Sequence, residues 1–244
     1  MTWVKICGTT NLEDALVAVE AGADAVGFVF YEKSPRNVSV ETAREIVGKL
    51  PESVEKIGVF VDDGEQDPAR VFLEAGLTGM QSYFSLDTGC KGGRRGILEA
   101  ALLPKRARFI IALPVKLLGE DLGQIQLSTD FANFGKNRPE GRSLPEDLYG
   151  TFVLDSGDLR SPGGTGKTFD WEKAVPIAEE MRRVGAKLVV AGGLAAGNVA
   201  EAMGILKPWG VDVASGVEAS PGKKDPGKVR AFVKAVREVD RRSA

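Results

Sequence analysis

Eight short apolar segments, each followed by a segment of helical character, recur along this 244-residue sequence. Near-continuous apolar strands are typical of parallel sheets that are buried on both faces. Alternation at this spacing predicts a parallel sheet with right-handed crossovers, and eight units favour a closed barrel over an open sheet. We therefore expect one α/β domain over residues 1–244, a single (β/α)8 TIM barrel. The predicted strands are 4–7, 25–30, 56–61, 77–83, 109–113, 151–154, 188–191 and 211–213.

The predicted helices follow these strands, and the first has clear end signals. Asn11 is expected to cap it, acids occupy its first turn, and Gly22 ends it. The middle of the chain is less regular. It holds a glycine-rich basic loop at 89–96 and a polar stretch at 133–147, which we interpret as an irregular insertion between strands five and six. The predicted helices span 12–21, 39–50, 67–75, 97–103, 117–127, 171–184, 198–206 and 226–239.

The composition excludes several kinds of site. The chain has no histidine and two cysteines, Cys7 and Cys90, which excludes a Ser-His-Asp triad and argues against structural zinc. Any general base must then be Asp, Glu, Lys, Tyr or Cys. A net charge of −2 without a long basic run argues against nucleic acid or a membrane surface as a partner. With no apolar run of about 18 residues and no signal peptide, we expect a cytoplasmic protein.

Two chemically distinctive side chains end predicted strands, Cys7 on the first and Asp155 on the sixth. Active sites of such barrels lie at the C-terminal ends of the strands. Lys5 and Cys7 alternate with Ile6, so both face the barrel interior if Ile6 faces the helices. Lys5 could lower the thiol pKa, or it could pair with a carboxylate of another strand. The simpler alternatives are a buried unreactive cysteine and a turn-capping aspartate.

Three further loops carry groups that can bind anions. Gly192-Gly193 and Ser215-Gly216 follow the last two strands, where this fold commonly binds phosphate through backbone amides. Turn glycines without a ligand are the alternative there. Arg36, in the loop after strand two, can present a forked donor to a carboxylate, with a solvated loop arginine as the alternative. The stretch Gly163-Gly164-Thr165-Gly166 predicts a hinged lid.

Short motifs mark both halves of the chain. They are Lys5-Ile-Cys-Gly8, Gly27-Phe-Val-Phe30, Ser34-Pro-Arg36, Gly58-Val-Phe-Val61, Leu154-Asp-Ser156, Gly163-Gly-Thr-Gly166, Phe169-Asp-Trp171, Ala191-Gly-Gly-Leu194, Asn198-Val199, Gly210-Val-Asp-Val213, Ser215-Gly-Val-Glu218 and Pro221-Gly-Lys-Lys-Asp225. In order and spacing this set resembles the phosphoribosylanthranilate isomerase family of tryptophan biosynthesis. The resemblance covers about residues 3–62 and 151–235.

The resemblance implies an Amadori rearrangement of N-(5-phosphoribosyl)anthranilate to 1-(2-carboxyphenylamino)-1-deoxyribulose 5-phosphate. It makes Cys7 the general base and Asp155 the general acid, with Arg36 binding the anthranilate part and the two glycine loops holding the phosphate. No metal or cofactor is implied, because the iminium formed on ring opening is itself the electron sink. The family's strand-four sequence Gln-Leu-His-Gly is replaced here by Gln81-Ser-Tyr-Phe84. The family's histidine faces the substrate, so Tyr83 is expected to take over a stacking or hydrogen-bonding role in substrate binding.

Two other functions stay open. The related aldose–ketose isomerisation of histidine biosynthesis is expected to use paired aspartates, whereas Cys7 stands on the first strand here. A non-catalytic or altered-specificity phosphosugar-binding barrel is suggested by the missing strand-four histidine, but a pure binder would have no use for both Cys7 and Asp155. The sequence is compatible with both a monomer and a homodimer.

Overall fold

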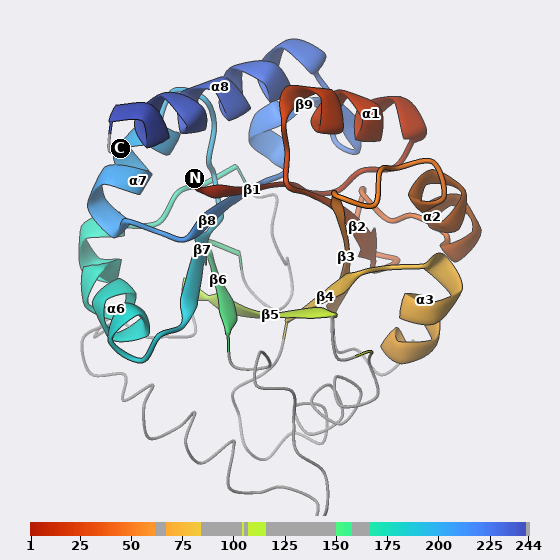
Figure 1. Cartoon of the computed structure of the whole chain (residues 1–244), viewed down its shortest axis with the longest axis horizontal. Helices are drawn as coiled ribbons and strands as arrows, with labels where there is room; N and C mark the ends of the chain where they lie inside the picture. The colour runs from red at the N-terminus through yellow and green to blue at the C-terminus, as the bar shows by residue number, and fades with distance from the viewer. Residues whose placement is uncertain (62–66, 84–103, 105–106, 116–149, 158–165, 243–244) are drawn as a thin grey trace, which may run out of the picture.

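Eight parallel strands close into a barrel in chain order, which confirms the predicted fold (Figure 1). The computed structural model describes residues 1–61, 67–83, 104, 107–115, 150–157 and 166–242. The barrel closes where β1 pairs with β8, and Lys5 lies opposite Asp212 at this seam. The strands are β1 (Trp3–Ile6), β2 (Ala25–Phe30), β3 (Glu55–Val61), β4 (Gly79–Tyr83), β5 (Arg108–Pro114), β6 (Thr151–Asp155), β7 (Lys187–Val190) and β8 (Gly210–Val213).

Helices cover the outside of the barrel (Figure 1). The first helix has the predicted ends: the Asn11 side chain accepts from the Asp14 amide at 2.9 Å, and Gly22 is left-handed with φ 93°. The second covers 40–47 instead of the predicted 39–50. No helix in the described part of the chain is long and apolar enough to cross a membrane. The helices are α1 (Leu12–Ala21), α2 (Val40–Val47), α3 (Pro68–Ala75), α6 (Trp171–Arg183), α7 (Val199–Leu206) and α8 (Pro226–Arg242).

Several predictions for the middle of the chain lie outside the described residues. They are the helices at 97–103 and 117–127, the basic loop at 89–96 and the insertion at 133–147. They stay predictions. The flanking strands β5 and β6 pair directly with each other, in register from Ile110 opposite Thr151 to Pro114 opposite Asp155. This part of the barrel wall is therefore continuous.

Strand alternation places the apolar side chains in two layers. Val4 and Ile6 pack outward with the helices, whereas Trp3 and Cys7 belong to the cluster inside the barrel. Lys5 lies between these inward residues and is fully buried. The prediction that Lys5 and Cys7 share the interior face is therefore confirmed. Because Cys7 follows the last residue of β1, it lies at the carboxyl end of the barrel, where the chemistry of this fold is found.

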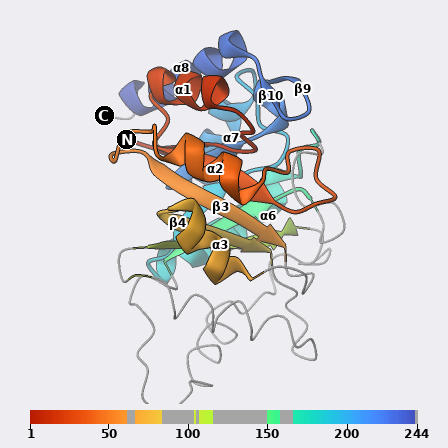
Figure 2. The ribbon, with the colours of Figure 1, turned by 90° about the vertical axis from the view of Figure 1, so that its right-hand side faces the viewer.

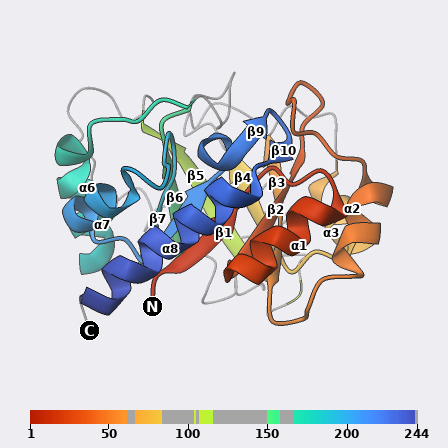
Figure 3. The ribbon, with the colours of Figure 1, turned by 90° about the horizontal axis from the view of Figure 1, so that it is seen from above.

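A small hairpin that the sequence analysis did not predict follows the eighth strand. The turn η4 (Ser215–Val217) leads into β9 (Glu218–Ser220), which pairs antiparallel with β10 (Lys223–Lys224). The side and top views place this hairpin at the end of the barrel away from the two chain termini (Figures 2 and 3). It therefore stands at the same end as the strand-end residues that were predicted to carry chemistry.

Candidate active site

A cavity at the carboxyl ends of the strands brings together most of the predicted site residues. Those that line it are Cys7, Arg36, Tyr83, Asp155, Gly192, Gly193 and Ser215. Gly216 is placed by packing instead, because a Cβ there would collide with the Leu194 carbonyl oxygen. Of the predicted lid only Gly166 is described; it is left-handed with φ 70°, and apart from its chain neighbours no atom of the described residues lies within 4 Å of where its Cβ would be. The lid itself stays a prediction.

Beneath the cavity, a buried ion pair supports the first strand. The Lys5 ammonium donates to Asp212 Oδ2 at 2.6 Å and to Gln81 Oε1 at 2.8 Å. Burial lowers the pKa of Lys5, but the charges of Asp212 and Cys7 outweigh it, so the pKa lies above its ordinary value. Lys5 therefore remains a cation under the thiol. The expected pairing of Lys5 with a carboxylate of another strand is confirmed.

The Cys7 thiol is held in an almost completely buried position, 8% exposed. Burial raises the pKa of the thiol, while the charge and hydrogen bond of Lys5 and the charge of Lys224 act in the opposite direction. The net shift is upward, because charged thiolate is costly away from water. The expectation of a lowered thiol pKa is thus wrong in its net direction, although Lys5 acts in the expected sense.

The Asp155 carboxylate, on the opposite wall, accepts from two donors in the described part of the chain. The Tyr83 hydroxyl donates to Oδ2 at 2.6 Å, and the Gly157 amide donates to Oδ1 at 3.0 Å. Burial, followed by the charge of Asp155, raises the pKa of Tyr83 well above its usual value, so the phenol keeps its proton. The turn-capping contact that was the alternative interpretation of Asp155 is therefore present, alongside the bond from Tyr83. The hydrogen-bond partner of Tyr83 in the structure is the proposed acid, and its expected contact with the substrate stays a prediction.

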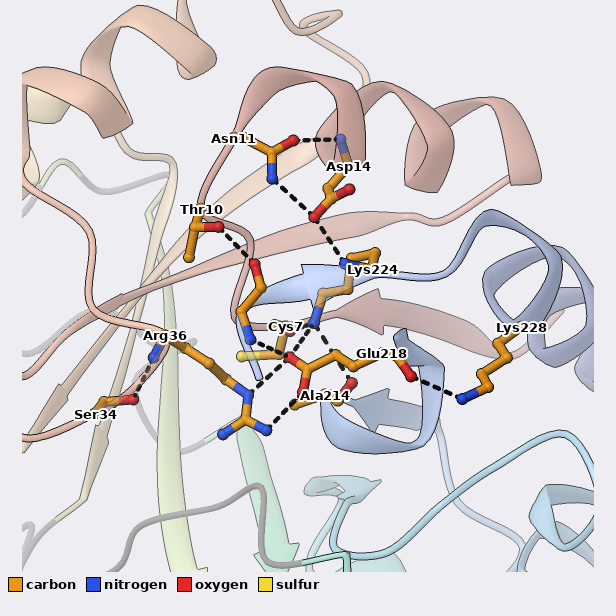
Figure 4. Close-up of polar contacts among 11 residues, drawn as sticks. Cys7, Thr10, Asn11, Asp14, Ser34, Arg36, Ala214, Glu218, Lys224 and Lys228 are labelled. Atoms are coloured by element: carbon orange, nitrogen blue, oxygen red, sulfur yellow. Dashed lines mark hydrogen bonds and ion pairs between the residues drawn. The ribbon is translucent and has the colours of Figure 1, made fainter. Parts of the chain in front are cut away.

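Arg36 faces the cavity with one edge of its guanidinium already paired. Nε donates to Glu218 Oε1 at 2.8 Å and Nη2 donates to Glu218 Oε2 at 2.7 Å, a bidentate pair with little exposure (Figure 4). Burial raises the pKa of Glu218, but the hydrogen bonds and charges of Arg36 and Lys224 outweigh it. The pKa of Glu218 therefore lies below its ordinary value. Gly8 leaves room for this arginine, because a Cβ there would lie 2.5 Å from Arg36 Cδ.

The loop after β7 is a tight glycine turn that another side chain stabilises. Gly192 and Gly193 are left-handed, with φ 78° and 64°, and a Cβ on either would lie 2.5 Å from backbone atoms of Ser156 or of Lys167 and Thr168. Asn198 accepts from the Ala195 amide at 2.8 Å and donates to the Gly193 carbonyl at 3.0 Å. Glycine at 192 and 193 is thus required by close approach, and the Asn198 side chain braces the loop instead of capping α7.

Three buried charged residues of this region were not singled out from the sequence. Asp212 lines the cavity, and its Oδ1 has no hydrogen-bond partner among the described residues. Glu218 and Lys224, on the hairpin, contact Arg36 and Cys7. Asp212 alternates with the apolar Val211 and Val213, a pattern that could have marked it as inward-facing. No group of three or more His, Cys, Asp or Glu in the described ranges is placed to hold a metal ion.

The sequence and structure are similar to those of one enzyme family. The family model described as N-(5'-phosphoribosyl)anthranilate (PRA) isomerase matches residues 4–81 and 143–235. N-(5'-phosphoribosyl)anthranilate isomerase of Rubrobacter xylanophilus is 43% identical, over 97% of this chain and all of its own length. The enzyme of Geobacter sp. strain M21 is 41% identical, over 96% of this chain and 97% of its own length.

Solved structures of phosphoribosyl anthranilate isomerases are also similar to this chain. The crystal structure of phosphoribosyl anthranilate isomerase from Thermotoga maritima is 36% identical, covers 98% of this chain and 100% of its own, and has a TM-score of 0.70. A second isomerase structure, in complex with reduced 1-(o-carboxyphenylamino)-1-deoxyribulose 5-phosphate, is 34% identical, covers 98% of this chain and 100% of its own, and has a TM-score of 0.67.

The closed barrel and the polar cavity at the carboxyl ends of its strands define a TIM-barrel enzyme. The family match covers more than half of the chain, and relatives align along almost the whole of it. The chain belongs to the N-(5'-phosphoribosyl)anthranilate isomerase family, isomerases of tryptophan biosynthesis.

Proposed function

We propose that this chain converts N-(5'-phosphoribosyl)anthranilate to 1-(2-carboxyphenylamino)-1-deoxyribulose 5-phosphate, with Asp155 as general acid and Cys7 as general base. The observation that carries the proposal is that both groups line one cavity, which also holds Arg36 and the two phosphate-type loops. A solved relative binds a reduced form of this product. The chemistry needs an acid, a base and two anion sites, and this cavity supplies a candidate for each.

The first step opens the ribose ring. Asp155 gives a proton to the ring oxygen, the C1–O bond breaks, and the anilino nitrogen lone pair forms an iminium with C1. Asp155 must enter this step as the carboxylic acid. The Tyr83 hydroxyl can donate to one Asp155 oxygen or accept from a protonated one, because a hydroxyl does both. Tyr83 is thus suited to hold the acid in either protonation state.

The second step removes the proton on C2. A Cys7 thiolate takes it, and the C2–H electrons move toward the iminium to form an enaminol, which tautomerises to the ketone. Because the thiol pKa is raised, the thiolate is the minor form near neutrality but a stronger base when it forms. The Lys5 cation beneath it stabilises the thiolate without taking its place as base, since Lys5 is itself paired with Asp212.

Two anion-binding parts of the cavity would orient the substrate. Arg36 would pair with the anthranilate carboxylate, and the backbone amides of Gly192-Gly193 and Ser215-Gly216 would bind the phosphate. The stretch Gly163-Gly164-Thr165-Gly166 would close over them as a lid. One solved structure is of monomers generated from the dimeric isomerase of Thermotoga maritima, and this chain is expected to act as a monomer or homodimer.

Turnover of N-(5'-phosphoribosyl)anthranilate by wild type, Cys7→Ser and Asp155→Asn tests the proposal. Loss of the anthranilate-type fluorescence of the substrate reports the reaction. We expect wild-type turnover and a loss of about 10²- to 10⁴-fold in each variant, the usual contribution of one acid–base group. Wild-type inactivity combined with tight binding of the phosphate ester would favour the non-catalytic barrel, and full activity in either variant would remove that residue from the mechanism.

A further inference from the structure

We propose that Glu218 is a positioning residue for carboxylate recognition: it holds Arg36 by one guanidinium edge, so that the other edge faces the substrate cavity. This inference rests on the proposed function and names a residue on which that function depends. Nε and one Nη2 hydrogen of Arg36 are taken by Glu218. Nη1 has no protein partner among the described residues, and Arg36 lines the cavity. The free edge is the one that a substrate carboxylate can reach.

Lys224 shares the Glu218 carboxylate with Arg36, so that this carboxylate does not fully neutralise the charge of Arg36. Its side chain is completely buried, and its ammonium donates to Glu218 Oε1 at 3.0 Å and to the Cys7 carbonyl at 2.5 Å (Figure 4). The Ala214 carbonyl, just before η4, lies 3.4 Å away. One carboxylate is therefore shared between two cations, and Arg36 retains attraction for a second anion. The same lysine ties the arginine to the strand end that bears the thiol.

The hairpin that carries this pair is fixed to the loops around it. The Lys224 amide donates to Asp14 Oδ2 at 2.8 Å, and the Thr10 hydroxyl donates to the Gly222 carbonyl at 2.6 Å. Gly222 packs so closely on the loop after β2 that a Cβ there would lie 2.9 Å from the Pro35 carbonyl oxygen. Glu218 is thus presented by a rigid support, as positioning requires.

The substitution Glu218→Gln breaks the clamp while conserving side-chain volume. Both Glu218 oxygens accept from N–H groups: Oε2 from Arg36 Nη2, and Oε1 from Arg36 Nε, Lys224 and, at 3.3 Å, the Gly222 amide. Whichever way the amide is turned, its NH2 group faces another donor. Arg36 must then move, and its free edge is no longer aimed at the cavity.

The test compares two ligands in each variant. One is reduced 1-(o-carboxyphenylamino)-1-deoxyribulose 5-phosphate, and the other is the same compound without the carboxyl group. Calorimetry gives the ratio of their dissociation constants, which isolates carboxylate recognition. In wild type the carboxylate should tighten binding on the order of 10- to 100-fold, as charge-assisted hydrogen bonds do. In Glu218→Gln the ratio should fall to about threefold or less, with the carboxyl-free ligand bound as before.

The matched control is Glu55→Gln. Glu55 holds Arg108 with the same bidentate geometry, at 2.5 and 2.6 Å, but at the first residues of β3 and β5, the far end of the barrel. The ratio of the two dissociation constants in Glu55→Gln should equal the ratio in wild type. If Glu218→Gln does not fold, Glu218→Gln/Lys224→Met, which removes the opposing charges together, carries the same expectation.

Three results would overturn the inference. They are a wild-type ratio near one, an unchanged ratio in Glu218→Gln with both affinities unchanged, and an unchanged ratio with both ligands weakened equally, which would reduce Glu218 to a structural ion. Failure of the proposed function is distinguishable, because it would appear as absent turnover in wild type irrespective of these ratios.

Discussion

The Tyr83 hydroxyl donates a 2.6 Å hydrogen bond to Oδ2 of Asp155, between two side chains that are each almost fully buried. This contact joins the end of β4 to the end of β6 across the barrel mouth. Tyr83 occupies the position on strand four at which the family resemblance predicts a histidine. Here a phenol with a strongly raised pKa stands next to the proposed acid and keeps its proton.

Tyr83→Phe should lower kcat about tenfold, which corresponds to roughly 1–1.5 kcal/mol for one lost hydrogen bond to a buried group. The substitution keeps the ring packing but leaves Oδ2 of Asp155 without its donor. Tyr83→His is the informative companion, because an imidazole N–H can donate in place of the hydroxyl, and it should retain more activity than Tyr83→Phe. Steady-state kinetics with N-(5'-phosphoribosyl)anthranilate measures kcat of the two variants and of wild type. A Phe variant with wild-type kcat would show that Asp155 does not need this partner.

Lys5 and Asp212 should shift the Cys7 thiol pKa in opposite directions. Lys5 lowers that pKa and Asp212 raises it, so Lys5→Met should move the thiol titration to higher pH and Asp212→Asn to lower pH. Thiolate absorbance in a Cys90→Ser background reports Cys7 alone, since the chain has two cysteines. An unshifted titration in Lys5→Met would reduce Lys5 to a structural ion.

Much of the fold could be predicted from the sequence, because each strand–helix unit carries its own local pattern. The ends of α1 and the span of β2 agree with the prediction residue by residue. The hairpin and its charges could not be predicted in this way. Glu218 and Arg36 are 182 residues apart, and Lys224 and Cys7 are 217 apart, so no local spacing joins them. The direction of the thiol pKa also depended on burial, which strand-end position alone does not give.

Gly27→Ala should damage both the site and the stability. A Cβ on Gly27 would lie 2.7 Å from Cys7 Sγ and 3.0 Å from Lys5 Cε, so either the thiol or the lysine must move. Overpacking of this kind costs about 1–3 kcal/mol of unfolding free energy. Gly204→Ala lies in the exposed part of α7, where no side chain of the described residues comes within 4 Å of the added Cβ, and it should instead stabilise by up to about 1 kcal/mol. Urea unfolding and kcat measure the two effects; a fully active and stable Gly27→Ala would contradict the close approach.

Asp240, at the end of α8, ties the two ends of the chain together where the barrel closes. It accepts from the Thr2 amide at 3.1 Å and from the Thr2 hydroxyl at 2.6 Å, and Arg237 Nη1 lies 3.4 Å away. The two termini lie side by side in every view of the molecule (Figures 1, 2 and 3). Burial raises the pKa of Asp240, but the hydrogen bonds from Thr2 and Arg237 outweigh this effect. The pKa of Asp240 therefore lies below its ordinary value.

Asp240→Asn should therefore lower the unfolding free energy by about 1–3 kcal/mol at pH 7, the usual loss for hydrogen bonds to a charged group. Because the folded pKa is depressed, this stabilisation is complete above the unfolded pKa of about 3.9 and disappears as the pH falls through the folded pKa. The difference between wild type and variant, from urea unfolding at several pH values, should thus shrink below about pH 4. Glu238→Gln is the control on the same helix: its exposed partner Lys234 lies 3.9 Å away, so the change should cost less than about 0.5 kcal/mol at any pH. Equal losses in the two variants would show that Asp240 contributes no more than surface charge.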